Sequence, residues 1–280
     1  MRIEHQFSIA GFEVSVSFPD GWDADTLLPS FRPFYGKKEG QEKALLKCTV
    51  CTSVENKAAM PSGELIENTL SDMGYVSLYK EAEGYCVTLS AEQGGTLHVM
   101  QTDRRFSTVR VYLHEEDKRA GHALSSLLRI AYSQAVLYWD AVSIHASAVY
   151  CENKAFLFMG KSGTGKSTHS SLWMKYIQGT ELLNDDNPTL RIVDGKVYAY
   201  GTPWSGKTPC YKSLSYPVGG MVRLKQAPAN RFVRQQEVEA FIALFPGCCV
   251  IHQDAELRAC LYVDSDGRTS SCGSIGMQTR

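Results

Sequence analysis

Residues 160–168 read Gly-Lys-Ser-Gly-Thr-Gly-Lys-Ser-Thr, and this stretch decides the expected fold of the chain. It matches the pattern of a phosphate-binding loop, or P-loop. The apolar run 155–159 before it predicts a strand, and the apolar spacing in 168–178 predicts a helix. A strand, a Gly-rich turn and a helix form the context that supports the motif, so the sequence predicts a site for a nucleoside triphosphate. The residues at the fixed positions of the motif are Gly160, Gly165, Lys166 and Ser167.

The residue types in this loop suit it to hold phosphate groups. Gly163 and Gly165 allow the backbone to turn its N–H groups inward, which forms an anion-sized nest. The helix that follows adds unpaired amides and the positive end of its dipole. Lys166 is expected to reach the β- and γ-phosphate oxygens, and the Ser167 hydroxyl to ligate Mg²⁺. The predicted nucleotide-binding residues are Gly160, Ser162, Gly163, Thr164, Gly165, Lys166, Ser167 and Thr168.

A second strand is predicted immediately before the one that leads into the P-loop. It covers residues 142–150, and only residues 151–154 lie between it and 155–159. So short a connection predicts an antiparallel hairpin, because parallel strands need a crossover of a dozen or more residues. The hairpin would place His145 opposite Met159 or Gly160, at the mouth of the phosphate site. His145 is therefore a candidate catalytic residue, with a structural histidine as the alternative.

Two adjacent aspartates follow the next predicted strand, residues 180–184. A right-handed crossover would return this strand beside the P-loop strand, with its carboxyl end at the phosphates. One carboxylate of Asp185 and Asp186 could then hold the metal, and the other could accept a proton from the attacking hydroxyl. Simple turn formation before Pro188 is the alternative reading of the pair.

The following residues are rich in strand and turn signals. The Asp194-Gly195 turn predicts a hairpin of 189–193 with 196–200. The loop 201–209 that comes next is either a substrate lid, with Trp204, Ser205 and Lys207, or an ordinary surface loop. A further strand is predicted over 218–224. Three arginines near or after it could face a transferring phosphate or simply be solvated: Arg223, Arg231 and Arg234.

The ordered set of these motifs resembles the HPr kinase/phosphorylase-like kinases, which are structurally related to the ATP-dependent phosphoenolpyruvate carboxykinases. The set comprises Ile-His-Ala-Ser-Ala-Val from 144, the hairpin, the P-loop, Asn-Asp-Asp at 184–186 and Tyr-Gly-Thr-Pro-Trp at 200–204. The resemblance covers roughly residues 120–245. Thr168 stands where HPr kinases usually have an acidic residue, and their C-terminal Gly-Arg-Asn docking motif has no clear counterpart. HPr itself is therefore not the implied substrate.

The resemblance implies an α/β fold (α+β, mixed sheet) with a kinase core flanked by helices. It implies ATP and Mg²⁺ as cofactors and transfer of the γ-phosphoryl group to a hydroxyl, typically serine, of a protein, peptide or small molecule. His145 and Asp185 or Asp186 match the family's catalytic His and Asp, and residues 160–167 match its nucleotide loop. The candidate catalytic residues are His145, Lys166, Asp185 and Asp186, and the candidate metal ligands are Ser167, Asp185 and Asp186.

Composition and net charge limit the classes of binding partner and the cellular compartment expected for the protein. A net charge of −1 offers no basic face for nucleic acid and no polybasic membrane anchor. No apolar run approaches the roughly 20 residues that a membrane-spanning helix needs. The nine cysteines, in a chain whose first residues lack a signal-peptide layout, favour a reducing cytoplasm and free thiols. The Cys48–Cys51 spacing falls in an expected strand and is interpreted as structural.

Three segments are expected along the chain. Residues 1–117 predict a β-rich domain of unknown role, with one helix near 62–72. Residues 118–263 predict the P-loop kinase domain, which begins with an amphipathic helix. Residues 264–280 are rich in Ser, Gly and Thr and are expected to be poorly ordered.

A different class of function stays open beside the kinase. A nucleotide-binding regulatory or scaffold protein would bind ATP without efficient transfer, although such a module would be expected to lose part of the set formed by His145, Lys166, Ser167 and the aspartate pair. The sequence leaves open the acceptor, the oligomeric state, reversal by phosphate or pyrophosphate chemistry, and which aspartate is the base.

Overall fold

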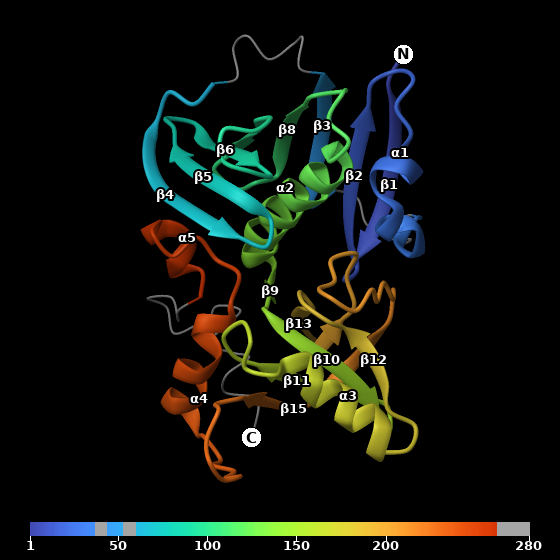
Figure 1. The fold of residues 1–280 in the computed structure, drawn as a ribbon, viewed down its shortest axis with the longest axis vertical. Coiled ribbons are helices and arrows are strands. Elements are labelled where there is room, and N and C mark those ends of the chain that lie inside the picture. Colours follow the sequence, from blue (N-terminus) through green and yellow to red (C-terminus); the bar gives the residue numbers. More distant parts are fainter. Residues whose placement is uncertain (37–43, 53–59, 262–280) are drawn as a thin grey trace. The chain divides into compact units, whose positions relative to one another are not determined.

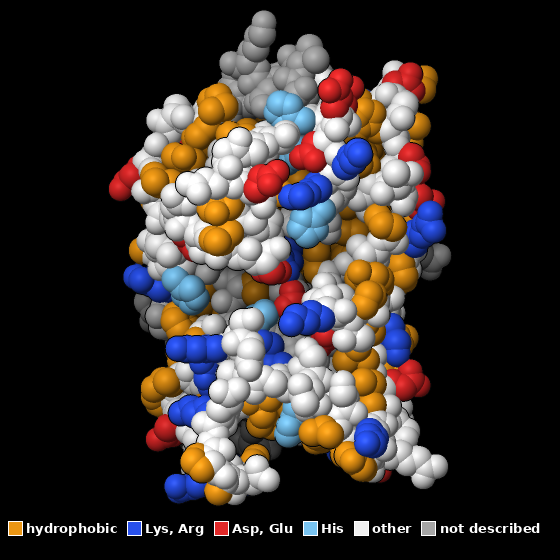
Figure 2. Space-filling model, viewed as in Figure 1, with side chains coloured by type: hydrophobic (Ala, Val, Ile, Leu, Met, Phe, Trp, Pro, Cys, Tyr) orange, Lys and Arg blue, Asp and Glu red, His pale blue; other side chains and the backbone are white. Residues whose placement is uncertain are grey.

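The computed structural model describes residues 1–36, 44–52 and 60–261, and the chain divides into two compact units, Met1–Ala135 and Val136–Arg280. Each unit is built on its own mixed β-sheet, so the molecule is a mixed α/β protein in which strands predominate (Figure 1). The tail 264–280, expected to be poorly ordered, lies outside the described residues. Hydrophobic, basic and acidic side chains are interspersed over the face drawn in Figure 2.

The N-terminal unit is an eight-stranded sheet in the order β1-β2-β3-β8-β7-β6-β5-β4. The β1–β2 hairpin turns at Ala10 and Gly11, both at positive φ, and pairs Ile9 with Phe12. Its elements are β1 (Ile3–Ile9), β2 (Phe12–Phe18), α1 (Ala24–Leu27), η1 (Pro29–Phe34), β3 (Leu46–Thr52), β4 (Glu64–Ser71), β5 (Gly74–Lys80), β6 (Gly84–Ser90), β7 (His98–Asp103), β8 (Thr108–Leu113) and α2 (Ala120–Ala135).

Two expectations for this unit are wrong. The helix predicted near 62–72 is strand β4, because antiparallel pairing with β5 along its length outweighs the helical preference of its Glu and Leu residues. The boundary expected after residue 117 falls after Ala135. The amphipathic helix α2 packs its apolar face on β3, β6, β7 and β8, so it belongs to the N-terminal sheet.

The second unit is a seven-stranded sheet in the order β12-β10-β11-β15-β14-β13-β9. The long strand β15 pairs with β14 through its first residues and with β11 through its later ones, so it joins the two halves of the sheet. Its elements are η3 (Val136–Trp139), β9 (Ala141–Ser143), β10 (Ala146–Cys151), β11 (Lys154–Met159), α3 (Lys166–Tyr176), β12 (Glu181–Asn184), β13 (Thr189–Val193), β14 (Lys196–Tyr200), β15 (Ser215–Arg223), α4 (Glu237–Leu244), η4 (Phe245–Gly247) and α5 (Ala255–Ala259).

The hairpin predicted before the Gly-rich loop is confirmed. Strands β10 and β11 are antiparallel, and Ala146 pairs with Met159, so His145 lies at the level of Gly160. The two turn residues, Glu152 and Asn153, have φ of 48° and 60°, which is the type I′ geometry that matches the twist of the strands. The predicted hairpin of 189–193 with 196–200 is likewise confirmed.

The strand expected over 142–150 is divided. β9 pairs with β13 at one edge of the sheet and β10 pairs with β11 and β12 at the other, so the chain changes neighbours at Ile144 and His145. The expectation that strand 180–184 lies beside the P-loop strand is wrong, because β10 intervenes between β12 and β11. Since β12 and β11 are both antiparallel to β10, their carboxyl ends still point the same way, which keeps the aspartate pair near the Gly-rich loop.

Helix α3 covers this part of the sheet and contacts β10, β11 and β12. Trp173 packs against the rings of Phe156 and Phe158, at centroid distances of 4.9 and 5.3 Å, and His169 packs against Phe158. Ser170 is the buried polar residue of the helix. These contacts fix the start of α3 at the carboxyl end of β11, so the loop between them is held at both ends.

Candidate functional site

The Gly-rich loop, residues 160–165, turns sharply between β11 and α3. Gly160, Gly163 and Gly165 have φ of 151°, 80° and 100°, where side chains other than hydrogen are strained. A Cβ on Gly160 would meet Thr164 Oγ1 at 2.5 Å. Thr164 tightens the turn by donating its N–H and its hydroxyl to Lys161 O. Glycine is thus required at Gly160 by close packing as well as by backbone conformation.

The first turn of α3 presents backbone N–H groups without a side-chain cap. Its N-cap residue is Gly165, which has no side chain to accept them, and the turn contains no acidic residue. Helix starts with this character attract anions through their free amides and the positive end of the dipole. Ser167 and Thr168 lie in this turn, and Ser162 is exposed on the loop. The residues predicted to bind phosphate therefore lie on the loop 160–165 and in the first turn of α3.

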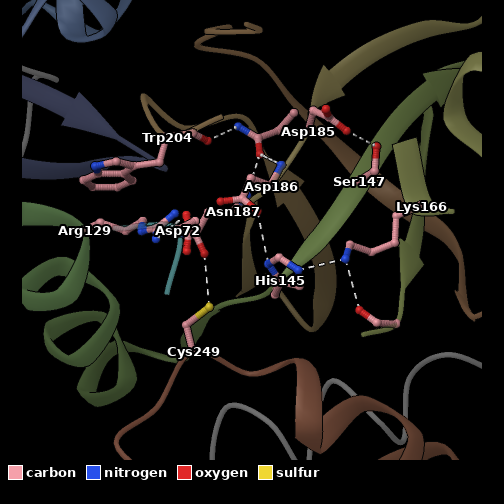
Figure 3. A network of polar contacts seen from close by, with 12 residues as sticks. Asp72, Arg129, His145, Ser147, Lys166, Asp185, Asp186, Asn187, Trp204 and Cys249 are labelled. Carbon is pink, nitrogen blue, oxygen red and sulfur yellow. Dashed lines mark hydrogen bonds and ion pairs between the residues drawn. The ribbon is translucent and has the colours of Figure 1, made fainter. Parts of the chain in front are cut away.

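Lys166 and His145 meet across the hairpin (Figure 3). Lys166 Nζ lies 2.8 Å from His145 Nε2 and 3.1 Å from Gly160 O. An ammonium group has no acceptor, so His145 Nε2 must accept and the ring proton must sit on Nδ1. His145 Nδ1 lies 3.1 Å from Asp186 Oδ1 and donates to it. Lys166, His145 and Asp186 therefore form one directed chain of hydrogen bonds.

The charges along this chain affect Lys166. Burial lowers the pKa of its ammonium, while the negative charges of Asp186 and then Asp185 counteract that shift. The Asp186 side chain is 13% exposed and that of His145 is 43% exposed. The hydrogen-bonded series Lys166–His145–Asp186 is thus exposed to solvent at His145 and mostly shielded from solvent at Asp186.

Asp185 is held by a separate network. Ser147 Oγ donates to Asp185 Oδ1 at 2.8 Å, so the hydroxyl of Ser170 must supply the proton of the 2.6 Å Ser147–Ser170 contact. The Thr208 N–H donates to Asp185 Oδ2 at 3.2 Å. Since Ser170 lies one turn beyond Ser167 on α3, this network ties Asp185 to the helix start. The two aspartates therefore have different partners: Asp185 connects to α3 and Asp186 connects to His145.

Sequence reasoning missed the residues that orient these side chains. Asn184 Nδ2 donates to Trp204 O at 3.0 Å, and its Oδ1 accepts the backbone N–H groups of Asp186 and Asn187. The His145 N–H donates to Gly247 O at 2.7 Å. Ser147 is on β10 two residues after His145, so strand periodicity was a usable signal for it. The contact with Gly247 joins residues about a hundred positions apart in sequence and had no local signal.

The other candidate residues separate into two groups. Trp204 is buried and Ser205 forms an isolated bridge with Asp186, so the 201–209 loop adjoins the aspartates. Arg223 donates instead to Ala243 O, which ties β15 to α4. Arg231 and Arg234 are exposed. The predicted strand over 218–224 is the later part of β15.

Within the described residues, no group of three or more His, Cys, Asp or Glu side chains is arranged to hold a metal ion. Mg²⁺ in proteins keeps several waters and takes one or two carboxylates with hydroxyl or phosphate oxygens. A hydroxyl at Ser167 and a carboxylate at Asp185 are oxygen donors of that kind. The eight described cysteines are all free thiols, and Cys48 and Cys51 are buried.

No protein-family model matches the chain, and no curated protein matches it either. In the part of the chain that the structure describes, no helix is both long enough and apolar enough to cross a membrane.

Proposed function

We propose that the protein is an ATP-dependent kinase with a P-loop core of the type found in HPr kinases and phosphoenolpyruvate carboxykinases. The γ-phosphoryl group passes to a hydroxyl, serine being the typical acceptor. The observation that carries the proposal is the hydrogen-bond chain from Lys166 through His145 to Asp186, with contacts of 2.8 and 3.1 Å. It joins a phosphate-binding type of loop to a carboxylate that can take a proton.

The loop and the helix start fit a nucleotide triphosphate. The N–H groups of residues 160–168 would bind the phosphates, and Lys166 would lie against the β- and γ-oxygens. Lys166 Nζ now contacts Gly160 O and Lys161 O, weak neutral partners that a charged phosphate oxygen replaces. Ser167 and Asp185 would hold Mg²⁺, which would neutralise part of the phosphate charge.

Asp186 acts as the base in this proposal. The acceptor hydroxyl approaches the γ-phosphorus, its O–H proton passes to Asp186, and its oxygen forms the new P–O bond. The bond from the γ-phosphorus to the bridging oxygen breaks, and ADP leaves with that electron pair. The His145 Nδ1–H group donates a hydrogen bond to Asp186 Oδ1. This hydrogen bond orients the carboxylate so that its remaining lone pairs face the acceptor.

Conservative replacement of the two aspartates tests these roles separately. Asp186→Asn keeps the shape but removes the base, so turnover should fall by roughly 10²–10⁴-fold while affinity for ATP changes little. Asp185→Asn removes the metal-side charge, so Mg²⁺-dependent ATP binding should weaken as well. The measurements are ADP release with labelled ATP and calorimetric binding of an ATP analogue at several Mg²⁺ concentrations.

The exposed Asp194→Asn in the β13–β14 turn is the matched control and should keep wild-type values. Wild-type turnover in both active-site variants, on an acceptor that the wild-type protein phosphorylates, would exclude the catalytic role of the pair. ATP binding with no detectable transfer to any acceptor would instead favour the nucleotide-binding regulatory or scaffold protein.

A further inference from the structure

The loop 201–209 is fastened to the aspartate pair by its backbone. The Gly206 N–H donates to Asp185 O and the Thr208 N–H donates to Asp185 Oδ2, both at 3.2 Å. A Cβ on Gly206 would lie 2.7 Å from Asp185 O, so a larger residue could not take its place without a shift. Ser205 Oγ donates to Thr208 O and closes the turn. The turn 205–208 thus has a fixed position against the two carboxylates.

The base of this loop is equally constrained. Asn184 Nδ2 donates to Thr202 Oγ1 and Trp204 O, and Thr202 Oγ1 donates to Asn187 O at 2.8 Å. Thr202 is fully buried and Trp204 is 5% exposed. The loop 201–209 is therefore buried at its base and hydrogen-bonded at both its base and its tip. These contacts favour a fixed loop over a mobile lid.

Lys207 is the residue at the tip of this turn, and its side chain is exposed. Within the described residues it has no ion pair or side-chain hydrogen bond. Lys166 differs, because it is partly buried and its charge is offset by the aspartates. The turn therefore carries an exposed cation, while its backbone contacts Asp185.

The turn contacts both aspartates, Asp185 through the N–H groups of Gly206 and Thr208 and Asp186 through the backbone of Ser205. Ser205 pairs with Asp186 through a backbone bridge, whereas the Gly-rich loop reaches Asp186 through Lys166 and His145. The groups next to the hydroxyl of an acceptor that contacts Asp186 would then come within reach of residues 205–208. A long, mobile ammonium side chain there suits an anionic group on the acceptor.

We propose that Lys207 binds a carboxylate of the acceptor, and that the acceptor is therefore a hydroxyl compound with a carboxylate close to the reacting hydroxyl. This inference rests on the proposed kinase function. The carboxylate could belong to a free hydroxy amino acid or to an acidic residue beside a serine in a peptide. Both present the same chemistry to Lys207.

Matched acceptor pairs test the proposal with the full chain, labelled ATP and Mg²⁺. One arm compares L-serine with L-serinamide, and the other compares serine peptides flanked by Asp or Glu with the same peptides flanked by Asn or Gln. In one arm, the wild-type protein should prefer the carboxylate member by roughly tenfold or more in kcat/KM, as expected of a charge-assisted hydrogen bond. The arm that shows the preference identifies the source of the carboxylate.

Substitution of the lysine should remove that preference. Lys207→Ala should lower kcat/KM for the carboxylate member and leave the amide member unchanged, whereas Lys207→Arg should retain most of the preference. Lys196→Ala, at an exposed lysine of the β13–β14 hairpin, is the control and should match the wild-type protein.

Three results would overturn the role of Lys207. The wild-type protein could have the same kcat/KM for the carboxylate and amide acceptors in both arms. Alternatively, Lys207→Ala could keep the preference for the carboxylate acceptor, or lose kcat/KM equally for both acceptors. A wild-type protein that transfers label to no acceptor in either arm would contradict the kinase function itself.

Discussion

His145 connects the two charged parts of the site because of its tautomer. A lysine ammonium can only donate, so the contact at 2.8 Å leaves Nε2 without a proton and places the proton on Nδ1, facing Asp186. A doubly protonated ring would set two cations against each other. His145 therefore connects the start of α3 to the Asp186 carboxylate through its two ring nitrogens.

A second histidine, His98 in the N-terminal unit, is buried and contacts an aspartate. His98 is 1% exposed, and its Nε2 lies 2.9 Å from Asp117 Oδ2. The His114 N–H donates to Nδ1 at 3.4 Å, so Nε2 carries the proton and donates to Asp117. Burial lowers the pKa of His98, and the hydrogen bond and charge of Asp117 offset part of this shift.

We expect the N-terminal unit to lose stability as the pH falls below about 6.5, the ordinary pKa of the side chain. Below that value the unfolded chain binds a proton that folded His98 resists, so the free energy of unfolding decreases, by at most about 1.4 kcal/mol per pH unit for one proton. Denaturant unfolding at pH values from about 7.5 down to about 5 measures this decrease.

His98→Gln, which does not titrate there, should show a smaller decrease than the wild-type protein. The comparison isolates this residue from His252, whose pKa burial also lowers. Identical pH dependence of the wild-type protein and the variant would show that His98 contributes nothing to it.

At the scale of elements, the hairpin β10–β11 brings His145 close to the Gly-rich loop and Lys166. Its turn sets Glu152 at φ 48°, a left-handed conformation that costs a residue with a Cβ about 1–2 kcal/mol relative to a right-handed one. Glycine relieves that strain but adds freedom to the unfolded chain.

We expect Glu152→Gly to stabilise the second unit by about 0.5–1 kcal/mol, and Glu152→Pro to destabilise it, because proline fixes φ near −65°. Thermal and denaturant unfolding measure both changes. A glycine variant less stable than the wild-type protein would contradict the strain at this turn.

Local signals predicted the elements whose contacts are local. The short connection after Cys151 predicted the β10–β11 hairpin, and the Asp194-Gly195 turn predicted the β13–β14 hairpin. The order of the strands could not be predicted from local signals. No short-range pattern indicates that β10 lies between β11 and β12. Contacts between segments far apart in the sequence, such as His145 with Gly247, could not be predicted for the same reason.

At the scale of the whole molecule, all the candidate residues belong to the second unit, Val136–Arg280. The N-terminal unit has its own sheet and its own helix, α2. The sequence indicated a β-rich first half but placed α2 with the site, because amphipathic spacing shows that a helix has an apolar face and not which sheet covers it. The chemistry proposed for the protein thus depends on residues from a single unit.

Binding of an ATP analogue tests the central claim most directly. Calorimetry with a non-hydrolysable analogue and Mg²⁺ should detect binding to the wild-type protein. Lys166→Ala removes the cation expected to lie against the β- and γ-phosphates, so affinity should fall about tenfold or more, the loss typical of a hydrogen bond to a charged group. Lys175→Ala, on the same helix, should bind like the wild-type protein. Undiminished affinity in Lys166→Ala would contradict the assignment of the Gly-rich loop as the phosphate site.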